Sequence, residues 1–305
     1  MNRTIRIGTR ESQLALWQAA TVMNLVEDAG YKAELVLIKS DGDTDLKTPL
    51  YEIGVQGIFT KALDIALLNN EIDIAVHSMK DVPTVMAKGI VQAAVLPRAS
   101  YKDLLVPKPD EKFSDERAHL TIATSSIRRK AQWLNRYPGS EVENLRGNVN
   151  TRLRKLEESN WHGAIFAAAG LERIGLRPDN AVELDWMLPA PAQGAIIVVC
   201  RGNDRYNTEV CRSFHDAYTG LCTSIERDFL RTLLGGCSTP ISALAEIDNG
   251  FVVFRGNILS RDGRQKKEVY KKVPMQQSAT LGKDAAIELL GDGGQEILNT
   301  FRNEN

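Results

Sequence analysis

The sequence predicts an α/β protein with two α/β units, each built on a mostly parallel sheet, and a smaller C-terminal α+β unit. Short apolar runs of strand length alternate with helical patterns over about the first 200 of the 305 residues. This alternation is interrupted by a proline-rich stretch at 97–110 and then restarts. Beyond residue 240 the pattern changes to consecutive strand-like runs. The length also exceeds what one core usually accommodates, which favours two or three domains.

The first unit begins with a strand at 4–10, and Ser12 is expected to cap a helix that ends near Gly30. The next segment, 40–57, has four glycine and proline residues among polar ones, a composition typical of functional loops. The other predicted elements of this unit are a strand, a helix and two further strands, at 33–39, 58–70, 72–78 and 89–96.

The second unit repeats this order after the proline-rich stretch, which we expect to be a linker or crossover. Its strands are predicted at 120–125, 141–146 and 163–169, and its helices at 125–137 and 148–160. A second hinge, LPAPAQG at 188–194, precedes a buried strand at 195–200 and a helical pattern at about 204–234. The last unit has antiparallel strands at 241–247, 251–259 and 267–273 and a closing helix at 279–302.

Composition excludes several classes of protein. The net charge of −1, with 43% apolar and 25% charged residues, is ordinary for a globular protein and argues against a nucleic-acid coat or a membrane-surface binder. No apolar run approaches the ~20 residues that span a bilayer, and the first ten residues lack the apolar region of a secretory signal. The four cysteines form no CxxC pair or zinc-ligand spacing, so we expect no metal site and a reducing, cytoplasmic compartment.

Arginines gather where strands of the second unit end. Residues 121–155 carry eight positive and two negative side chains, a net charge of +6 in a chain of −1. Each arginine could simply belong to a solvated helix face. However, Arg128, Arg129 and Arg152 are expected at helix N-termini, where a cation opposes the helix dipole and a negative ligand would resolve the conflict. Guanidinium groups bind carboxylates or phosphates in pairs, so the pattern predicts a polyanionic small molecule in a cleft between the two α/β units.

Nucleic acid is a poorer candidate for this anion. The basic residues are not interleaved with aromatic ones, and neither of the common glycine-rich phosphate-binding motifs occurs.

Two residues stand out from this basic environment. Asp81 follows an apolar strand in HSMKDVP; it could pair with a neighbouring arginine, cap a turn before Pro83, or stabilise positive charge that forms on a substrate. Cys237, in the flexible stretch GGCSTP, could be a surface thiol or a covalent attachment point. His77 is isolated from other histidines and is expected to be a hydrogen-bonded framework residue rather than a base.

Seven stretches together resemble the porphobilinogen deaminase family, also called hydroxymethylbilane synthases. They occur in the family's order between about residues 3 and 245: TRESQLALWQ, DIAVHSMKDVP, TSSIRRKAQ, LRGNVNTRLRKL, AAAGLERIGL, PAPAQGA and GGCSTP. The resemblance implies a transferase that condenses four porphobilinogen molecules head to tail, releases ammonia each time, and hydrolyses the product to hydroxymethylbilane. The chain would grow on a dipyrromethane cofactor, held by a thioether.

The resemblance also implies roles for individual residues. Asp81 matches the catalytic aspartate, and Cys237 matches the thiol that carries the dipyrromethane. The other matches to cofactor-binding positions are Lys80, Ser125, Arg128, Arg129, Arg146 and Gln193. The matches to substrate-binding positions are Arg10, Ser12, Gln18, Arg146, Arg152 and Arg173. Porphobilinogen bears an acetate and a propionate, which fits the anionic ligand that the many arginines alone predict.

The family fold implies two domains that resemble periplasmic binding proteins, with two crossovers between them, and a third that carries the cysteine. We therefore expect domain 1 at 1–97 and 195–214, domain 2 at 98–194 and domain 3 at 215–305. The resemblance further suggests a monomer that hands its product to uroporphyrinogen-III synthase. The alternative is a non-catalytic, two-lobed binding protein for a small polycarboxylate, which would need neither Asp81 nor an exposed Cys237.

The sequence departs from the family pattern at several places. Glu52 and Gln56 stand where lysines are usual in the loop after the second strand. Ala62 and Leu234 each stand where many family members have a glutamate. PAPAQG replaces the usual PAVGQG. The part of the 40–60 loop in binding the chain is therefore open.

Overall fold

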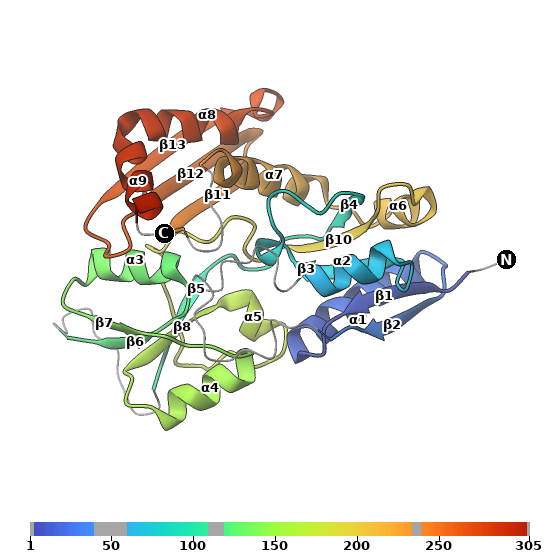
Figure 1. The fold of residues 1–305 in the computed structure, drawn as a ribbon, viewed down its shortest axis with the longest axis horizontal. Helices are drawn as coiled ribbons and strands as arrows, with labels where there is room; N and C mark the ends of the chain where they lie inside the picture. The colour runs from blue at the N-terminus through green and yellow to red at the C-terminus, as the bar shows by residue number, and fades with distance from the viewer. Residues whose placement is uncertain (1–2, 40–59, 109–118, 234–238, 304–305) are drawn as a thin grey trace. The chain divides into compact units, whose positions relative to one another are not determined.

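The computed structural model describes residues 3–39, 60–108, 119–233 and 239–303 (Figure 1). It divides into two compact units. Unit 1 holds the described parts of 1–45, 55–99 and 193–221, and unit 2 those of 100–192 and 222–305. The finer division into three domains stays a prediction. No described helix is long and apolar enough to cross a membrane.

Unit 1 contains a five-stranded sheet in the order β2-β1-β3-β10-β4. β1 is parallel to β2 and β3, whereas β10 runs antiparallel between β3 and β4. The mostly parallel sheet predicted from the sequence is therefore confirmed, with one reversed strand. The strands are β1 (Ile5–Thr9), β2 (Ala33–Leu37), β3 (Ile74–Ser78), β4 (Ile90–Val95) and β10 (Ile196–Arg201).

Helices cover both faces of this sheet. α1 (Gln13–Asp28) and α6 (Arg205–Arg212) bury Val22, Val26 and Val210 against one face. α2 (Lys61–Leu68) packs on the other, where a Cβ at Gly8 would come within 2.9 Å of a Leu63 methyl carbon. Ser12 caps α1 as predicted, since its Oγ accepts a hydrogen bond from Ala15 N at 3.3 Å.

Unit 2 contains a second sheet of the same plan, in the order β7-β6-β8-β5-β9. Here β5 is the reversed strand, antiparallel to β8 and β9. α3 (Ile127–Arg136) covers one face through Trp133, while α4 (Val149–Glu158) and α5 (Ala168–Glu172) cover the other. The strands are β5 (Asp103–Pro107), β6 (Thr121–Ala123), β7 (Glu141–Glu143), β8 (Gly163–Ala167) and β9 (Val182–Glu183).

The strand β5 is a correction to the sequence analysis, which placed it within a linker or crossover. Every residue of DLLVP is buried, so the segment is a central strand rather than a surface connection. Its prolines concealed this. Pro107 occupies the last strand position, where a missing N–H is tolerated.

The C-terminal part of unit 2 is a three-stranded antiparallel sheet covered by helices. α7 (Ala217–Thr232) places Phe229 against Phe254, with ring centroids 5.1 Å apart, and a Cβ at Gly256 would meet the same ring at 2.6 Å. The helical pattern predicted at 204–234 is divided into α6 and α7. That at 279–302 is divided into α8 (Leu281–Leu289) and α9 (Gln295–Asn303) by a kink at Gly293, φ +93°. The strands are β11 (Ile241–Asp248), β12 (Phe251–Leu259) and β13 (Lys266–Pro274).

This small sheet is joined to α3 by hydrogen bonds, which explains why both lie in one unit. Gln132 Nε2 donates to Ser242 Oγ at 3.1 Å, and Asn135 Nδ2 donates to the Gly263 carbonyl at 2.7 Å. A Cβ at Gly263, φ +73°, would lie 2.5 Å from the Ala131 carbonyl oxygen, so this turn approaches α3 as closely as glycine allows.

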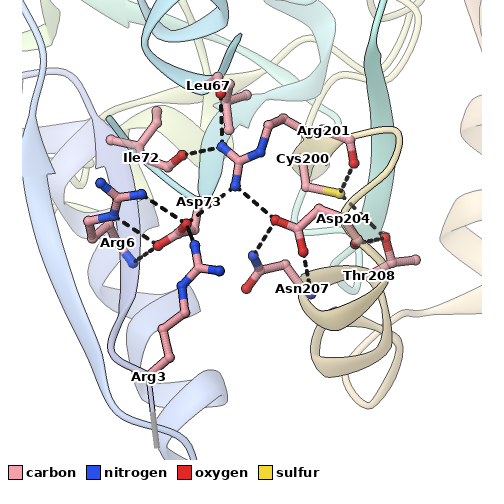
Figure 2. A network of polar contacts seen from close by, with 10 residues as sticks. All are labelled: Arg3, Arg6, Leu67, Ile72, Asp73, Cys200, Arg201, Asp204, Asn207 and Thr208. Carbon is pink, nitrogen blue, oxygen red and sulfur yellow. Dashed lines mark hydrogen bonds and ion pairs between the residues drawn. The ribbon is translucent and has the colours of Figure 1, made fainter. Parts of the chain in front are cut away.

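A buried carboxylate, Asp73, holds three arginines together at the end of the unit 1 sheet where β3 begins (Figure 2). Asp73, fully buried, pairs with Arg3 and Arg6, and its Oδ1 also lies 3.3 Å from an Arg201 nitrogen. Arg201 in addition donates to the carbonyls of Leu67 and Ile72. Burial alone would raise the pKa of Asp73, but the hydrogen bonds from Arg6 and the nearby positive charges outweigh it and hold the pKa below its usual value.

Candidate active site

The residues singled out from the sequence in unit 1 come together at one edge of its sheet. Arg10 and Ser12 follow β1, and Lys80 and Asp81 follow β3. Gln193 precedes β10, and because β10 is antiparallel to β3, its start lies at the same edge as the ends of β1 and β3. This is the edge where open α/β sheets bind ligands.

A tight turn presents the Lys80–Asp81 pair at this edge. β3 ends at Ser78 and a single 3₁₀ turn, Met79–Asp81, follows. Met79 is buried as the anchor of the turn, and Val82 N donates to its carbonyl at 3.2 Å. Lys80 Nζ donates to Gln193 Oε1 at 3.2 Å. Within the described residues Asp81 forms no ion pair, so the structure does not favour the salt bridge with a neighbouring arginine that was considered from the sequence.

Gln18 supports this turn from α1. Its side chain is buried, and its Nε2 donates to Ser78 Oγ at 2.9 Å, one residue before the turn begins. Ser12 is engaged as the cap of the same helix. The family resemblance implies substrate binding for both, and in the structure both also have these supporting contacts.

His77 lies on β3 just before the turn and is 6% exposed. Its Nε2 has no hydrogen-bond partner within the described residues, which differs from the hydrogen-bonded role expected from the sequence. Burial disfavours the imidazolium, and with the positive charge of Arg10 it lowers the pKa of His77 to about 3. His77 is therefore neutral at physiological pH.

We expect this histidine to weaken the fold in acid. Between pH 6.5 and about 3 the unfolded chain binds a proton at His77 that the folded chain does not, so stability falls as pH falls, by up to roughly 1.4 kcal/mol per pH unit. In His77→Gln the free energy of urea unfolding should fall less steeply between pH 6 and 4. The exposed His119→Gln is the control and should follow the wild type. Parallel slopes for wild type and His77→Gln would refute this origin of acid sensitivity.

In unit 2, Arg128 and Arg129 occupy the first turn of α3 and are both about 5% exposed or less. They are not a solvated helix face. Arg128 NH2 lies 2.7 Å from one oxygen of Asp103, and Arg129 NH2 lies 2.8 Å from the other. A protein carboxylate thus offsets part of the charge at this helix N-terminus.

Asp103 is a residue that the sequence analysis missed. It is the first residue of β5 and is fully buried. Because β5 is antiparallel and pairs Asp103 with Ala167 at the end of β8, its carboxylate lies at the edge where Ser125 and the arginines follow their strands. An acidic residue opening the apolar run DLLV was the available signal.

The remaining candidates of unit 2 follow the ends of β6, β7 and β8. Ser125 Oγ donates to the Leu145 carbonyl at 2.5 Å. Arg146 is buried, and the next residue, Gly147, has φ +116°, which lets Asn148 turn back and cap the helix that carries Arg152. Arg173 ends α5, and burial lowers its pKa to about 10 despite the nearby Glu172.

The charge balance at this edge favours an anionic ligand. Asp103 supplies one negative charge to two buried guanidinium groups. Burial lowers the pKa of Arg128 and the charge of Asp103 offsets this effect only in part; Arg128 Nε has no partner within the described residues. Carboxylates would supply the missing negative charge and acceptors. The residues therefore fit a ligand that bears several carboxylates.

Cys237 lies outside the described residues. Two of the other thiols, those of Cys200 and Cys211, belong to the buried hydrophobic core of unit 1. Cys200 Sγ also lies 3.5 Å from Thr208 Oγ1. Burial raises the pKa of Cys211 to about 12 and raises that of Cys200, so both are poor nucleophiles at neutral pH. Neither is therefore a good candidate for a covalent attachment point.

Comparison with known proteins gives consistent matches along the chain. The family model "Porphobilinogen deaminase, dipyromethane cofactor binding domain" matches residues 5–209, and the model of the C-terminal domain of porphobilinogen deaminase matches 220–291. The chloroplastic porphobilinogen deaminase of Pisum sativum is 42% identical over 97% of this chain and 84% of its own. The probable porphobilinogen deaminase of Methanocaldococcus jannaschii is 42% identical over 93% and 99%.

Among solved structures, the methionine-binding protein MetQ is similar over 71% of this chain and 92% of its own, with 13% identity and a TM-score of 0.45. The two family models together cover most of the chain, including both sheets with their arginines and the C-terminal sheet. The chain therefore belongs to the porphobilinogen deaminase family.

Proposed function

We propose how the residues of this chain carry out the family's reaction. The chain is a transferase of tetrapyrrole synthesis that condenses four porphobilinogen molecules head to tail, releases ammonia, and frees hydroxymethylbilane by hydrolysis. It uses a dipyrromethane cofactor, which supplies the primer for the growing chain. The non-catalytic binding protein considered from the sequence is not favoured.

The arginines and Lys80 are proposed to hold carboxylates. Arg128, Arg129 and Arg146, with Ser125, would hold the cofactor, because they are buried or half-buried at one sheet edge and carry an excess of positive charge. Lys80 and Gln193 would do so from unit 1, where their side chains already contact each other. The residues assigned to incoming substrate are Arg10, Ser12, Gln18, Arg146, Arg152 and Arg173.

Asp81 is proposed as the catalytic residue. As ammonia leaves, positive charge develops on the pyrrole of the substrate, and a fixed carboxylate that accepts a hydrogen bond from the pyrrole N–H stabilises it. The observation that carries this role is the 3₁₀ turn, which places Asp81 half-buried at the ligand-binding edge with no ion pair among the described residues.

Three finer features remain proposals. Cys237 is proposed to carry the cofactor through a thioether, since the described thiols Cys200, Cys211 and Cys222 are all buried. We also propose a cytoplasmic location, because the three described cysteines are buried free thiols, which suit a reducing compartment. The monomeric state is proposed from the family resemblance. Its product would pass to uroporphyrinogen-III synthase.

The intact mass of the purified protein, measured beside Cys237→Ala, tests the cofactor and its attachment. We expect the wild type to exceed its sequence mass by one dipyrromethane unit and the variant to lack this addition. A bare wild type would first be incubated with porphobilinogen. A thiol that stayed unmodified after this treatment would refute the attachment and the mechanism built on it.

A further inference from the structure

An uncharged side chain of α3 holds a stretch of unit 2 that belongs to no helix or strand. Leu188 lies in this stretch, so its backbone N–H and carbonyl need partners outside any regular element. Gln132 binds both groups. Its Oε1 accepts from Leu188 N at 2.9 Å, and its Nε2 donates to the Leu188 carbonyl at 2.9 Å. The amide of Gln132 therefore pairs with Leu188 much as a neighbouring strand would.

Gln132 is itself fixed by its surroundings. Its side chain is 4% exposed, and its Nε2 also donates to Ser242 Oγ of β11 at 3.1 Å. A primary amide offers two donor hydrogens and an acceptor oxygen, and here all three are engaged by residues of unit 2. Glutamate has the same shape but no donor, so the contacts at this position require the amide.

The Leu188 carbonyl has a second donor, Arg128. Arg128 precedes Gln132 by four residues, so both side chains leave the same side of α3. Its NH1 donates to this carbonyl at 2.7 Å, and its NH2 donates to Asp103 at 2.7 Å. Because a guanidinium group is planar, contacts at two of its nitrogen atoms fix the direction of its plane. Its Nε–H has no partner within the described residues, so a donor remains for a ligand.

We propose that Gln132 is a positioning residue for the reaction: by holding the Leu188 carbonyl in place, it orients the guanidinium of Arg128 toward a carboxylate of the dipyrromethane. This inference rests on the proposed role of Arg128 in holding the cofactor. Gln132 itself is not expected to touch the cofactor, because its amide is fully engaged. Without it, the Leu188 carbonyl is free to turn away, and Arg128 can pivot about its contact with Asp103.

The test is a double-mutant cycle between Gln132→Met and Arg128→Lys. Methionine keeps the length of the side chain but has no N–H donor and no oxygen acceptor. We expect kcat per cofactor-loaded molecule to fall about tenfold, with KM for porphobilinogen within about twofold, because Arg128 is assigned to the cofactor rather than to incoming substrate. A lysine ammonium has no plane to orient, so in the Arg128→Lys background the same substitution should lower kcat by less than about threefold.

A second readout of the same cycle does not depend on turnover. Protein purified from cells that lack porphobilinogen is incubated with it, and the rate at which the dipyrromethane mass appears is followed by intact mass. Gln132→Met should slow this rate about tenfold alone and less than about threefold in the Arg128→Lys background. Equal losses in the two backgrounds, in either readout, would overturn the proposal.

Asn135→Ala is the control for a purely structural role. Asn135 also lies on α3, and its Nδ2 joins this helix to the small C-terminal sheet at another place, through the Gly263 carbonyl. This variant should match the wild type in kcat and KM. Unchanged kcat in Gln132→Met would overturn the proposal. If Gln132→Met does not fold, Gln132→Asn replaces it in the cycle, because asparagine is one methylene too short to bond both backbone groups of Leu188.

Amide hydrogen exchange tests the contact between Gln132 and Leu188 by itself. In Gln132→Met, the peptide that contains Leu188 should exchange at least about tenfold faster, with β6 and β8 unchanged, because its N–H has lost its acceptor. Equal exchange in wild type and variant would also overturn the proposal. A failure of the proposed function would look different: the wild type would gain no dipyrromethane mass with porphobilinogen, whatever the exchange shows.

Discussion

Asp81→Asn should lower kcat for porphobilinogen consumption by about 10²- to 10⁴-fold while leaving the fold and the covalent cofactor intact. The side chain keeps its size and one carbonyl oxygen but loses its charge. Binding of the substrate carboxylates is assigned to the arginines of the substrate-binding group rather than to Asp81, so KM should change little. These arginines are Arg10, Arg146, Arg152 and Arg173. Initial rates over a series of porphobilinogen concentrations, with the intact mass of the same preparation, measure both effects.

Asp28→Asn is the matched control for this variant. Asp28 is the exposed last residue of α1. The first turn of α1 lies at the ligand-binding edge, so Asp28, at the other end of the helix, lies away from it. The same loss of one negative charge from unit 1 should leave kcat and KM unchanged there. If Asp81→Asn retains kcat within about twofold of the wild type, Asp81 is not the group that stabilises the developing charge.

Asp103→Asn is expected to destabilise unit 2 by about 3–5 kcal/mol. The carboxylate is fully buried and each of its oxygens accepts from a different buried arginine. Asparagine fills the same space but leaves Arg128 and Arg129 with two uncompensated positive charges and turns an amide N–H₂ toward guanidinium donors. Urea unfolding followed by circular dichroism and by tryptophan fluorescence measures the loss, since Trp133 is buried in α3 beside these arginines.

Asp185→Asn controls for the removal of an aspartate from unit 2. Asp185 also forms an ion pair, with Lys102, but its side chain is 74% exposed, so the loss should stay below about 1 kcal/mol. Equal losses in the two variants would mean that Asp103 does not balance the arginine pair. An anion that binds these arginines should partly restore the stability of Asp103→Asn, with no such effect on Asp185→Asn.

Much of the fold was predictable because local patterns carried it. The strand and helix of each α/β repeat, the cap at Ser12 and the change to antiparallel strands near residue 240 all followed from periodicity and capping. The placement of Arg10, Lys80 and Arg146 at strand ends did so too, since parallel strands end at one edge.

What escaped prediction depends on contacts between distant segments. β5 was hidden by prolines and is a strand only because β8 and β9 flank it. Asp103 acquires its partners 25 and 26 residues away, through the antiparallel direction of that strand. The positive φ of Ala192 is not evident from the sequence, and Glu226, which accepts its backbone N–H, lies 34 residues further along the chain. The roles of individual site residues still rest on family resemblance, and the experiments above address them.

The place of β10 in the unit 1 sheet has a consequence for how the protein is made. β10 lies between β3 and β4, yet about a hundred residues separate it from β4 in the chain. Until the ribosome has added residue 201, β3 and β4 lack their shared neighbour, and Asp73 lacks Arg201. The first sheet to be started is thus completed only after all five strands of the second, β5 to β9, have been synthesised. A nascent chain that pauses in between would expose two unpaired apolar strand edges, the surfaces on which chaperones and aggregation act.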